Sequence, residues 1–183
     1  MKSILLEQYQ TKIKKELQKE LKIANISSVP KIEKICLNIG IGSYLQKLNS
    51  KDFSFVEKNL ELIAGQKPVL KKAKLSVSNF KLKENQPVGL AVCLRQDVAY
   101  NFLYKLINVV FPRVRDFRGI NANIFDNAGN CSIGFNDHTV FPEAVVPEDS
   151  RKIHGLQVTI ITSTNKNEHA KALLSKFGFP FKK

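Results

Sequence analysis

Acidic residues are scarce in this sequence, and the shortage limits which partners the protein can bind. Asp and Glu together number 16, against 29 Lys and Arg, so the formal net charge is +13 and the pI is about 9.7. Such a chain favours a polyanionic partner, because closely spaced phosphates release counterions when several cations bind them together. Nucleic acid is therefore the first candidate partner, and an anionic membrane surface is the second.

Long apolar runs are missing as well. The sequence contains no stretch of about 18 apolar residues that would form a membrane-spanning helix. The opening residues MKSILLEQYQ also lack the apolar core and small-residue cleavage site of a signal peptide. We therefore expect a soluble protein that is not exported and that works in a cytosol or inside an organelle.

Cysteine is rare, and its spacing gives no sign of a metal site. Cys36, Cys93 and Cys131 lie far apart in the sequence and form no Cys-x-x-Cys pair. Each lies in or beside an apolar stretch. We predict three free, buried thiols that act as small hydrophobic residues in a reducing compartment.

Catalytic and nucleotide-binding motifs are absent. His138, His154 and His169 occur in no H-E-x-x-H spacing, so we predict surface histidines or structural ones with satisfied hydrogen bonds. Gly40 and Gly42 follow a predicted strand, but Leu45 stands where G-x-G-x-x-G needs its third glycine, which favours a tight turn over a nucleotide site. We expect no catalysis, no cofactor, no metal and no small-molecule substrate.

Length and composition fit one compact domain over residues 1–183. With 43% apolar and 25% charged residues, the chain can close one hydrophobic core. Hydrophobic periodicity predicts an α+β two-layer sandwich, a mostly antiparallel mixed sheet with helices packed on one side. Helices are predicted at 3–23 (within an amino-terminal region 1–28), 52–64, 98–109 and after Asn165, strands at 32–39, 88–95 and 156–162, and a hairpin joining 124–125 to 133–135.

The predicted helices carry end signals. Gly65 ends the second helix, Phe111-Pro112 closes the third, and the Asn165 and Glu168 pair resembles a capping box that opens the last one. The first helix is amphipathic, and glutamates interrupt its cationic face. It is therefore expected to pack on the core or to lie along RNA rather than on a membrane.

The most basic part of the chain lies between residues 66 and 87. We interpret residues 71–87 as a basic mobile loop region flanked by strands. Lysines there can neutralise phosphates, and small polar side chains can bond phosphate or 2′-hydroxyl groups, but a solvated run of charges explains the same residues. The segment contains Lys67, Lys71, Lys72, Lys74, Asn79, Phe80, Lys81 and Lys83.

Two further groups of residues are of the RNA-contact type. Small side chains would let an RNA backbone approach a strand face that also bears Asn38 and Arg95, unless a helix of the same domain covers that face. Guanidinium groups suit phosphate binding or base stacking, although nearby Asp116 leaves structural ion pairs as an alternative. The strand face carries Cys36, Asn38, Ala91, Cys93 and Arg95, and the arginine group is Arg113, Arg115 and Arg118.

Several long motifs resemble one known family. They are VPKIEKICLNIGIG (29–42), GQKPVLKKAKLSVSNFKLKENQPVG (65–89), FLYKLINVVFPRVRDFRGI (102–120), FDNAGNCSIGF and VFPE. In this order they resemble the universal ribosomal protein five family of the large subunit, in its bacterial or organellar form. The similarity covers residues 29–181, whereas the first helix matches by position more than by sequence.

The resemblance implies a protein that performs no catalysis and needs no cofactor. Members of that family bind 5S rRNA, attach it to large-subunit rRNA in the central protuberance, touch P-site tRNA and bridge to small-subunit head protein thirteen. On matching motifs, the 5S rRNA site is Asn38, Gln66, Arg95 and Cys93. The loop that contacts tRNA or rRNA is Lys71, Lys72, Lys74, Asn79, Lys81 and Lys83. The surface for the bridge or for rRNA is Arg113, Arg115 and Arg118, and the bridge also includes the segment before Phe141.

Three departures from the family pattern matter for the site. The family usually has Thr at Cys93, Gly at Gln96 and Met at Ala99. A thiol is a weak donor, so a hydrogen bond from Cys93 to 5S rRNA is in question. A free-standing RNA chaperone with the same basic surface and a peripheral membrane protein that uses the first helix are the alternative functions.

Overall fold

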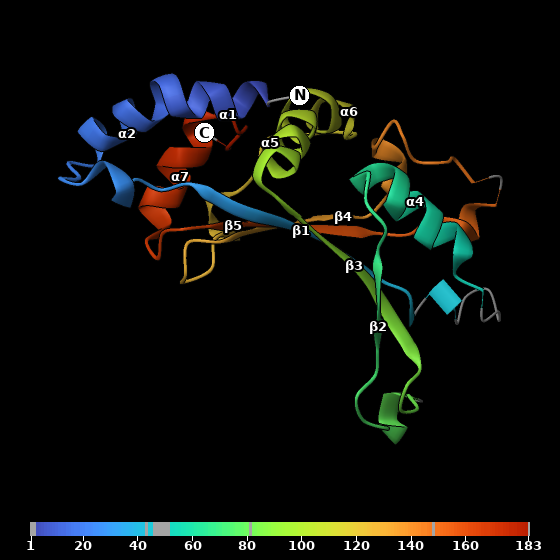
Figure 1. Cartoon of the computed structure of the whole chain (residues 1–183). Coiled ribbons are helices and arrows are strands. Elements are labelled where there is room, and N and C mark those ends of the chain that lie inside the picture. Colours follow the sequence, from blue (N-terminus) through green and yellow to red (C-terminus); the bar gives the residue numbers. More distant parts are fainter. Residues whose placement is uncertain (1–2, 43, 46–51, 81, 148, 183) are drawn as a thin grey trace. The chain divides into compact units, whose positions relative to one another are not determined.

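The protein, seen in a computed structural model, contains a sheet of five strands in the order β2-β3-β1-β5-β4 (Figure 1). The structure describes residues 3–42, 44–45, 52–80, 82–147 and 149–182. The strands are β1 (Ile32–Gly40), β2 (Val69–Lys72), β3 (Pro87–Arg95), β4 (Cys131–Phe135) and β5 (Leu156–Thr162).

Helical segments precede, separate and follow these strands. The α-helices are α1 (Ile4–Gln8), α2 (Lys14–Glu20), α4 (Ser54–Ala64), α5 (Gln96–Lys105), α6 (Phe111–Arg113) and α7 (Asn167–Lys176). Two π-helical segments, η1 (Tyr9–Ile13) and η4 (Leu106–Val110), continue α1 into α2 and α5 into α6. The 3-10 turns are η2 (Ile26–Ser28), η3 (Ser78–Phe80), η5 (Ala122–Ile124), η6 (His138–Val140) and η7 (Ser150–Lys152).

The sheet is antiparallel, so the α+β prediction is confirmed. Alternation along the strands divides buried from exposed residues, as expected when one face of a sheet meets the core. On β1, Leu37 and Ile39 are buried while Asn38 is exposed, and on β3 Val92 and Leu94 are buried on either side of the exposed Cys93. The helices therefore leave the other face of these two strands uncovered.

The chain divides into two compact units. The first unit comprises residues 1–35, 94–133 and 159–183, and the second comprises 36–93 and 134–158. Each has buried apolar residues of its own, such as Leu17, Leu103 and Leu173 in the first and Leu37, Leu60 and Leu90 in the second. The single domain expected over 1–183 stays a prediction.

The amino-terminal helix packs on the core of the first unit. Tyr9 is buried, and its ring centroid lies 6.1 Å from those of Tyr100 on α5 and Phe177 after α7. Its hydroxyl group donates a hydrogen bond of 2.9 Å to the carbonyl oxygen of Pro30. The predicted helix is thus confirmed over residues 4–20, and its apolar stripe is a core-packing stripe.

Two predicted element ends differ from the structure. The third predicted helix does not close at Phe111-Pro112 but continues through α6 to Arg113. Pro112 is one of the first residues of α6, where a missing N–H is tolerated. The last helix begins at Asn167, and its first residues have no side-chain cap. Asn167 instead accepts a hydrogen bond from the backbone N–H of Gly129, 38 residues away.

The predicted hairpin around residues 126–130 is shorter than expected. Asp126 accepts hydrogen bonds from the backbone N–H groups of Ala128 and Asn130, which fixes the turn. Among the described residues, the arm before the turn pairs with β4 through one bridge, Phe125 to Cys131, and residues 122–124 form a 3-10 turn rather than a strand. By contrast, the predicted end of α4 is confirmed, since Gly65 has the left-handed φ of 66°.

The prediction of three free thiols is wrong for two of them. Cys36 on β1 and Cys93 on β3 form a disulfide, with their Cα atoms 4.2 Å apart. Their 57-residue separation hid the pair, because only the neighbouring placement of β1 and β3 brings them together. Cys131 is free and buried as predicted, and burial, followed by nearby Asp126, raises the pKa of its thiol to about 12.

Candidate nucleic-acid interface

The uncovered face of β1 and β3 is the first part of the candidate interface. Asn38, Cys93 and Arg95 are all exposed, while the residues between them in each strand are buried. The alternative in which a helix covers these residues is therefore wrong. An exposed amide and guanidinium on strand residues offer hydrogen-bond donors whose backbone is held by the sheet.

A cavity of about 500 Å³ opens beside Asn38 in the second unit. Its walls come from the ends of β1, β2 and β3. Gly89 lines it without a side chain, and a Cβ there would lie 3.1 Å from the carbonyl oxygen of Ile39. The polar side chains that line it are one amide and three ammonium groups, a set suited to an anion such as a phosphate. They belong to Asn38, Lys71, Lys72 and Lys74.

The basic loop region is built as an extended hairpin. β2 pairs antiparallel with β3, with Val69 opposite Ala91 and Lys71 opposite Gly89, and the register shifts between Lys71 and Lys72. Beyond the strands, Ala73 donates to Gln86 at 2.9 Å, and a Val77 to Leu82 bridge closes the end. These bonds fix the positions from which the lysines leave the backbone.

Most of the predicted loop residues are exposed. Lys71, Lys72, Lys74, Asn79 and Lys83 all lie at the surface. None of these four lysines forms an ion pair within the described part of the chain, so their charges are available to phosphates. Lys81 lies outside the described residues.

The tip of the same hairpin also exposes apolar side chains, one of which the sequence reasoning missed. Leu75 is 74% and Phe80 75% exposed, the highest values among the large apolar residues that the structure describes. The sequence singled out Phe80 among the lysines, but not Leu75. The available signal for Leu75 was its apolar side chain in a lysine-rich segment that is too short to form a hydrophobic core.

The three arginines of the segment 113–118 are exposed on a fixed backbone. Phe117, between them, stacks on Phe111 with ring centroids 5.2 Å apart and an interplanar angle of 15°. In the part of the chain that the structure describes, no ion pair links Arg113, Arg115 or Arg118 to a carboxylate. The structural ion-pair alternative therefore has no support, and the guanidinium groups face solvent.

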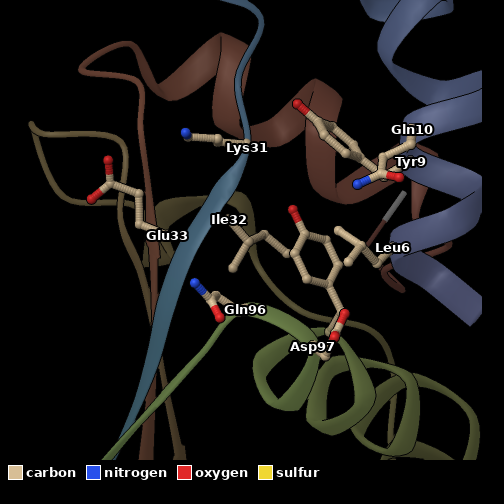
Figure 2. Close-up of a pocket in the computed structure, with 9 residues that line it drawn as sticks. Leu6, Tyr9, Gln10, Lys31, Ile32, Glu33, Gln96 and Asp97 are labelled. Atoms are coloured by element: carbon tan, nitrogen blue, oxygen red, sulfur yellow. The ribbon is translucent and has the colours of Figure 1, made fainter. Parts of the chain in front are cut away.

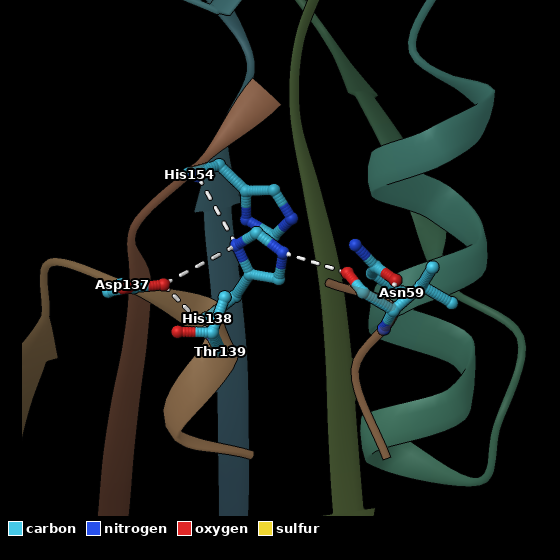
Figure 3. Close-up of polar contacts among 6 residues, drawn as sticks. Asn59, Asp137, His138, Thr139 and His154 are labelled. Atoms are coloured by element: carbon cyan, nitrogen blue, oxygen red, sulfur yellow. Dashed lines mark hydrogen bonds and ion pairs between the residues drawn. The ribbon is translucent and has the colours of Figure 1, made fainter. Parts of the chain in front are cut away.

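Two histidines form a buried cluster in the second unit (Figure 3). The rings of His138 and His154 stack with centroids 3.9 Å apart and an interplanar angle of 4°. The backbone N–H of His154 donates to Nδ1 of His138 at 3.3 Å, so the proton of His138 is on Nε2, 3.4 Å from the carbonyl oxygen of Val145. Both rings are buried inside the second unit.

His154 corrects the expectation of a surface or fully satisfied histidine. It is only 5% exposed, and neither ring nitrogen forms a well-aligned hydrogen bond among the described residues, although the backbone of Gly155 lies near enough to act on its pKa. Burial, and then the neighbouring His138, lowers the pKa of His154 to about 4. Asn59 of α4 accepts a hydrogen bond from the backbone N–H of Val145 at 3.0 Å, so this cluster fastens the 138–145 segment to α4.

A second cavity, of about 560 Å³, lies between the amino-terminal helix and α5 (Figure 2). Tyr9 and Tyr100 form part of its wall, and Lys31, Glu33 and Asp97 bring charges of both signs to it. This mixture does not favour a phosphate. Gln96 at its edge has a φ of 51°, in the left-handed region that favours glycine.

No helix among the described residues combines the length and apolarity needed to cross a membrane. Nor do the described His, Cys, Asp and Glu side chains gather in a group of three or more that would hold a metal ion.

Comparison with known families covers nearly the whole chain. Residues 25–83 match the sequence profile described as "Ribosomal protein L5", and residues 87–181 match the profile described as "ribosomal L5P family C-terminus". The boundary between the matches falls within the basic hairpin, just before β3.

Bacterial relatives match at similar extent. The chain is 48% identical over 180 residues to "Large ribosomal subunit protein uL5" of Thermosipho africanus, covering 98% of this chain and 97% of the relative. It is 44% identical over 183 residues to the protein of the same name from Acholeplasma laidlawii, with both chains covered completely. The protein of that name from Fusobacterium nucleatum is 47% identical over 168 residues, or 92% of this chain and 90% of the relative.

Proposed function

Because the chain belongs to the ribosomal protein L5 family, whose members are structural constituents of the large ribosomal subunit and not enzymes, we propose that it binds 5S rRNA. In this proposal it attaches 5S rRNA to the large-subunit rRNA in the central protuberance. The observation that carries the proposal is the uncovered face of β1 and β3 in the second unit, where Asn38 and Cys93 are exposed on strands whose other face is the core.

This face suits an RNA with a defined shape. Asn38 offers both a donor and an acceptor, and Arg95 offers the planar fork of donors that fits phosphates and base edges. Gly89, with no side chain, leaves the cavity beside Asn38 open to a sugar–phosphate backbone. Gln66, directly after Gly65 at the end of α4, is a further exposed amide of the second unit.

The basic hairpin is assigned to a second RNA contact, with P-site tRNA or large-subunit rRNA. Its exposed lysines, Lys71, Lys72, Lys74 and Lys83, attract phosphates of any sequence, and Asn79 adds an amide at the tip. Phe80, 75% exposed, offers a ring on which a base can stack. The segment with Arg113, Arg115 and Arg118 is assigned to the bridge with small-subunit head protein thirteen, since its cations are exposed and have no ion-pair partner among the described residues.

A filter-binding titration tests the 5S rRNA proposal. The purified protein is titrated with 5S rRNA and with an unrelated hairpin RNA of equal length, at two salt concentrations. We expect a preference for 5S rRNA that survives the higher salt, because hydrogen-bond recognition does not depend on counterion release. Equal binding of the two RNAs that disappears together with added salt would overturn the proposal in favour of a general RNA chaperone.

Matched variants locate the recognition surface. Asn38→Ala and Arg95→Ala are each expected to weaken 5S rRNA binding roughly 10-fold, since each removes hydrogen bonds to a charged or polar RNA group. Asn101→Ala on α5 and Arg151→Ala in η7 remove the same side-chain types from other exposed positions and should leave the affinity unchanged. Equal effects of the two pairs would remove the sheet face from the interface.

A further inference from the structure

We propose that Cys36 and Cys93 are a thiol–disulfide modification site on the uncovered sheet face, which low-molecular-weight disulfides oxidise and whose oxidation weakens 5S rRNA binding. The consequence for binding rests on the proposed function of this face. The oxidation itself does not, and it can be tested without RNA.

The placement of the two cysteines supports reversible bond formation. They lie on adjacent strands with Cα atoms 4.2 Å apart, just below the usual disulfide range of roughly 4.4–6.8 Å, so the two sulfur atoms are already within bonding reach. A pair more than about 7 Å apart would need such movement. Both residues belong to the second unit, so the pairing does not depend on how the two units are arranged.

Exposure distinguishes this pair from the third cysteine. Cys93 is exposed and Cys36 half-buried, whereas Cys131 is fully buried. A small disulfide reagent can therefore reach Cys93, and thiolates at accessible positions are the ones that exchange. Structural thiols that serve only packing lie in the core, as Cys131 does.

The chemical step is a two-electron thiol–disulfide exchange with a reagent RSSR. The Cys93 thiolate attacks one sulfur of RSSR, forms a mixed disulfide and releases one thiolate, which takes up a proton as RSH. The Cys36 thiolate then attacks the Cys93 sulfur and displaces the second RSH. The protein dithiol loses two electrons and two protons, and the reagent gains them as two thiols.

Oxidation changes what the face offers to RNA. In the dithiol, the S–H group of Cys93 is a weak donor that stands beside the exposed polar residues of the same strands. In the disulfide neither sulfur carries a hydrogen, so this donor is lost and the two strands are covalently linked. Because a thiol donates only weakly, loss of this one donor corresponds to a roughly 2-fold weaker complex.

The first experiment omits RNA. The full chain is equilibrated with mixtures of reduced and oxidised glutathione, its remaining thiols are alkylated, and its mass is measured. We expect one transition in which the protein loses two hydrogen atoms and two alkylation sites while Cys131 is unaffected. Alkylation of both Cys36 and Cys93 at every ratio, or a stable mixed disulfide with glutathione, would overturn the proposed site.

The second experiment measures 5S rRNA binding by the reduced and oxidised protein, with Cys36→Ser as a variant that cannot form the bond. Reduced protein should bind roughly 2-fold more tightly than oxidised protein, and the affinity of the variant should not differ between oxidised and reduced dithiothreitol. Equal affinity of the two forms of the wild-type protein would overturn the effect on binding. No preference for 5S rRNA even in the reduced form would instead count against the proposed function.

Discussion

Two groups of polar residues in the second unit behave in opposite ways. The RNA face, meaning Asn38 and Cys93 together with Lys71, Lys72, Lys74 and Lys83 of the basic hairpin, lies at the surface. The histidine cluster, meaning Asn59, His138 and His154, is buried, and its unpartnered atoms are Nδ2 of Asn59 and both ring nitrogens of His154. Polar atoms of the first group remain hydrated when the chain folds, whereas those of the second lose water without a replacement bond.

This difference separates binding from stability. Unused donors and cations at a surface cost the folded state little and become useful when a partner arrives. Buried polar atoms without partners destabilise the fold by about 1–3 kcal/mol each. Salt and surface substitutions should therefore act on RNA binding, and pH should act on the fold through His154.

The largest expected effect comes from removing the cations of the basic hairpin. Replacement of Lys71, Lys72, Lys74 and Lys83 by Ala should weaken RNA binding roughly 10³-fold at about 0.1 M salt, because each lost phosphate contact removes roughly 0.7 to 0.9 from the salt slope. The slope of log affinity against log salt should fall by roughly 3. Filter binding over a salt series measures both quantities.

A set of four exposed lysines elsewhere controls for net charge. The variant Lys12→Ala, Lys15→Ala, Lys19→Ala and Lys171→Ala has the same total charge as the hairpin variant. Its salt slope should stay close to that of the wild type. If both variants lose the same slope, the hairpin has no special part in binding and the contrast with the histidine cluster is lost.

Acid should destabilise the fold through His154. The pKa of His154 is lowered to about 4 in the folded protein, from an ordinary value near 6.5. As the pH falls from about 6.5 to about 4, the unfolded chain therefore takes up a proton that the folded chain does not, and stability is lost over this window. The loss should approach about 3 kcal/mol at the lower end.

Denaturant unfolding at a series of pH values measures this loss of stability. The control variant His169→Gln on α7 should lose stability with falling pH as the wild type does. His154→Gln removes the titrating group and should flatten the stability profile between pH 6.5 and 4. If the wild type and this variant lose stability in parallel, the buried ring of His154 is not the cause.

The smallest expected effect concerns Gln96, directly after Arg95. Its φ of 51° is unfavourable for a residue with a Cβ, so Gln96→Gly should stabilise the fold by about 0.5–1 kcal/mol, after allowance for the greater freedom of glycine in the unfolded chain. Unfolding in urea measures the gain. Gln157→Gly, in the extended strand β5, should act in the opposite direction, and a gain there too would argue against the backbone explanation.

Local patterns predicted the secondary structure where neighbours in sequence decide it. Alternation located β1, β3 and β5, and Gly65 marked the end of α4 in a left-handed conformation. The predictions failed where a distant residue intervened. Asn165 was expected to open α7. The helix begins instead at Asn167, whose side chain accepts a hydrogen bond from the backbone N–H of the distant Gly129.

The candidate site divides in the same way. The sequence alone picked out Asn38, Arg95 and the lysines by type and position, and the resemblance added Gln66. The sequence left open whether the strand face contacts RNA or is covered by a helix of the same domain. Burial excluded the helix, because the helices pack against the apolar residues and leave this face to solvent. The roles of these residues toward RNA stay predictions.

The basic charge, the helix and strand periods and the family motifs are properties of the chain in order, so the sequence by itself determined the class of partner and the α+β class. The Cys36 to Cys93 bond and the stacking of His138 on His154 join residues that are 57 and 16 positions apart. Nothing local specifies either pair. Only the placement of β1 beside β3, and of the segment after β4 beside the start of β5, brings them into contact, because strand neighbours are chosen by the packing of the whole core.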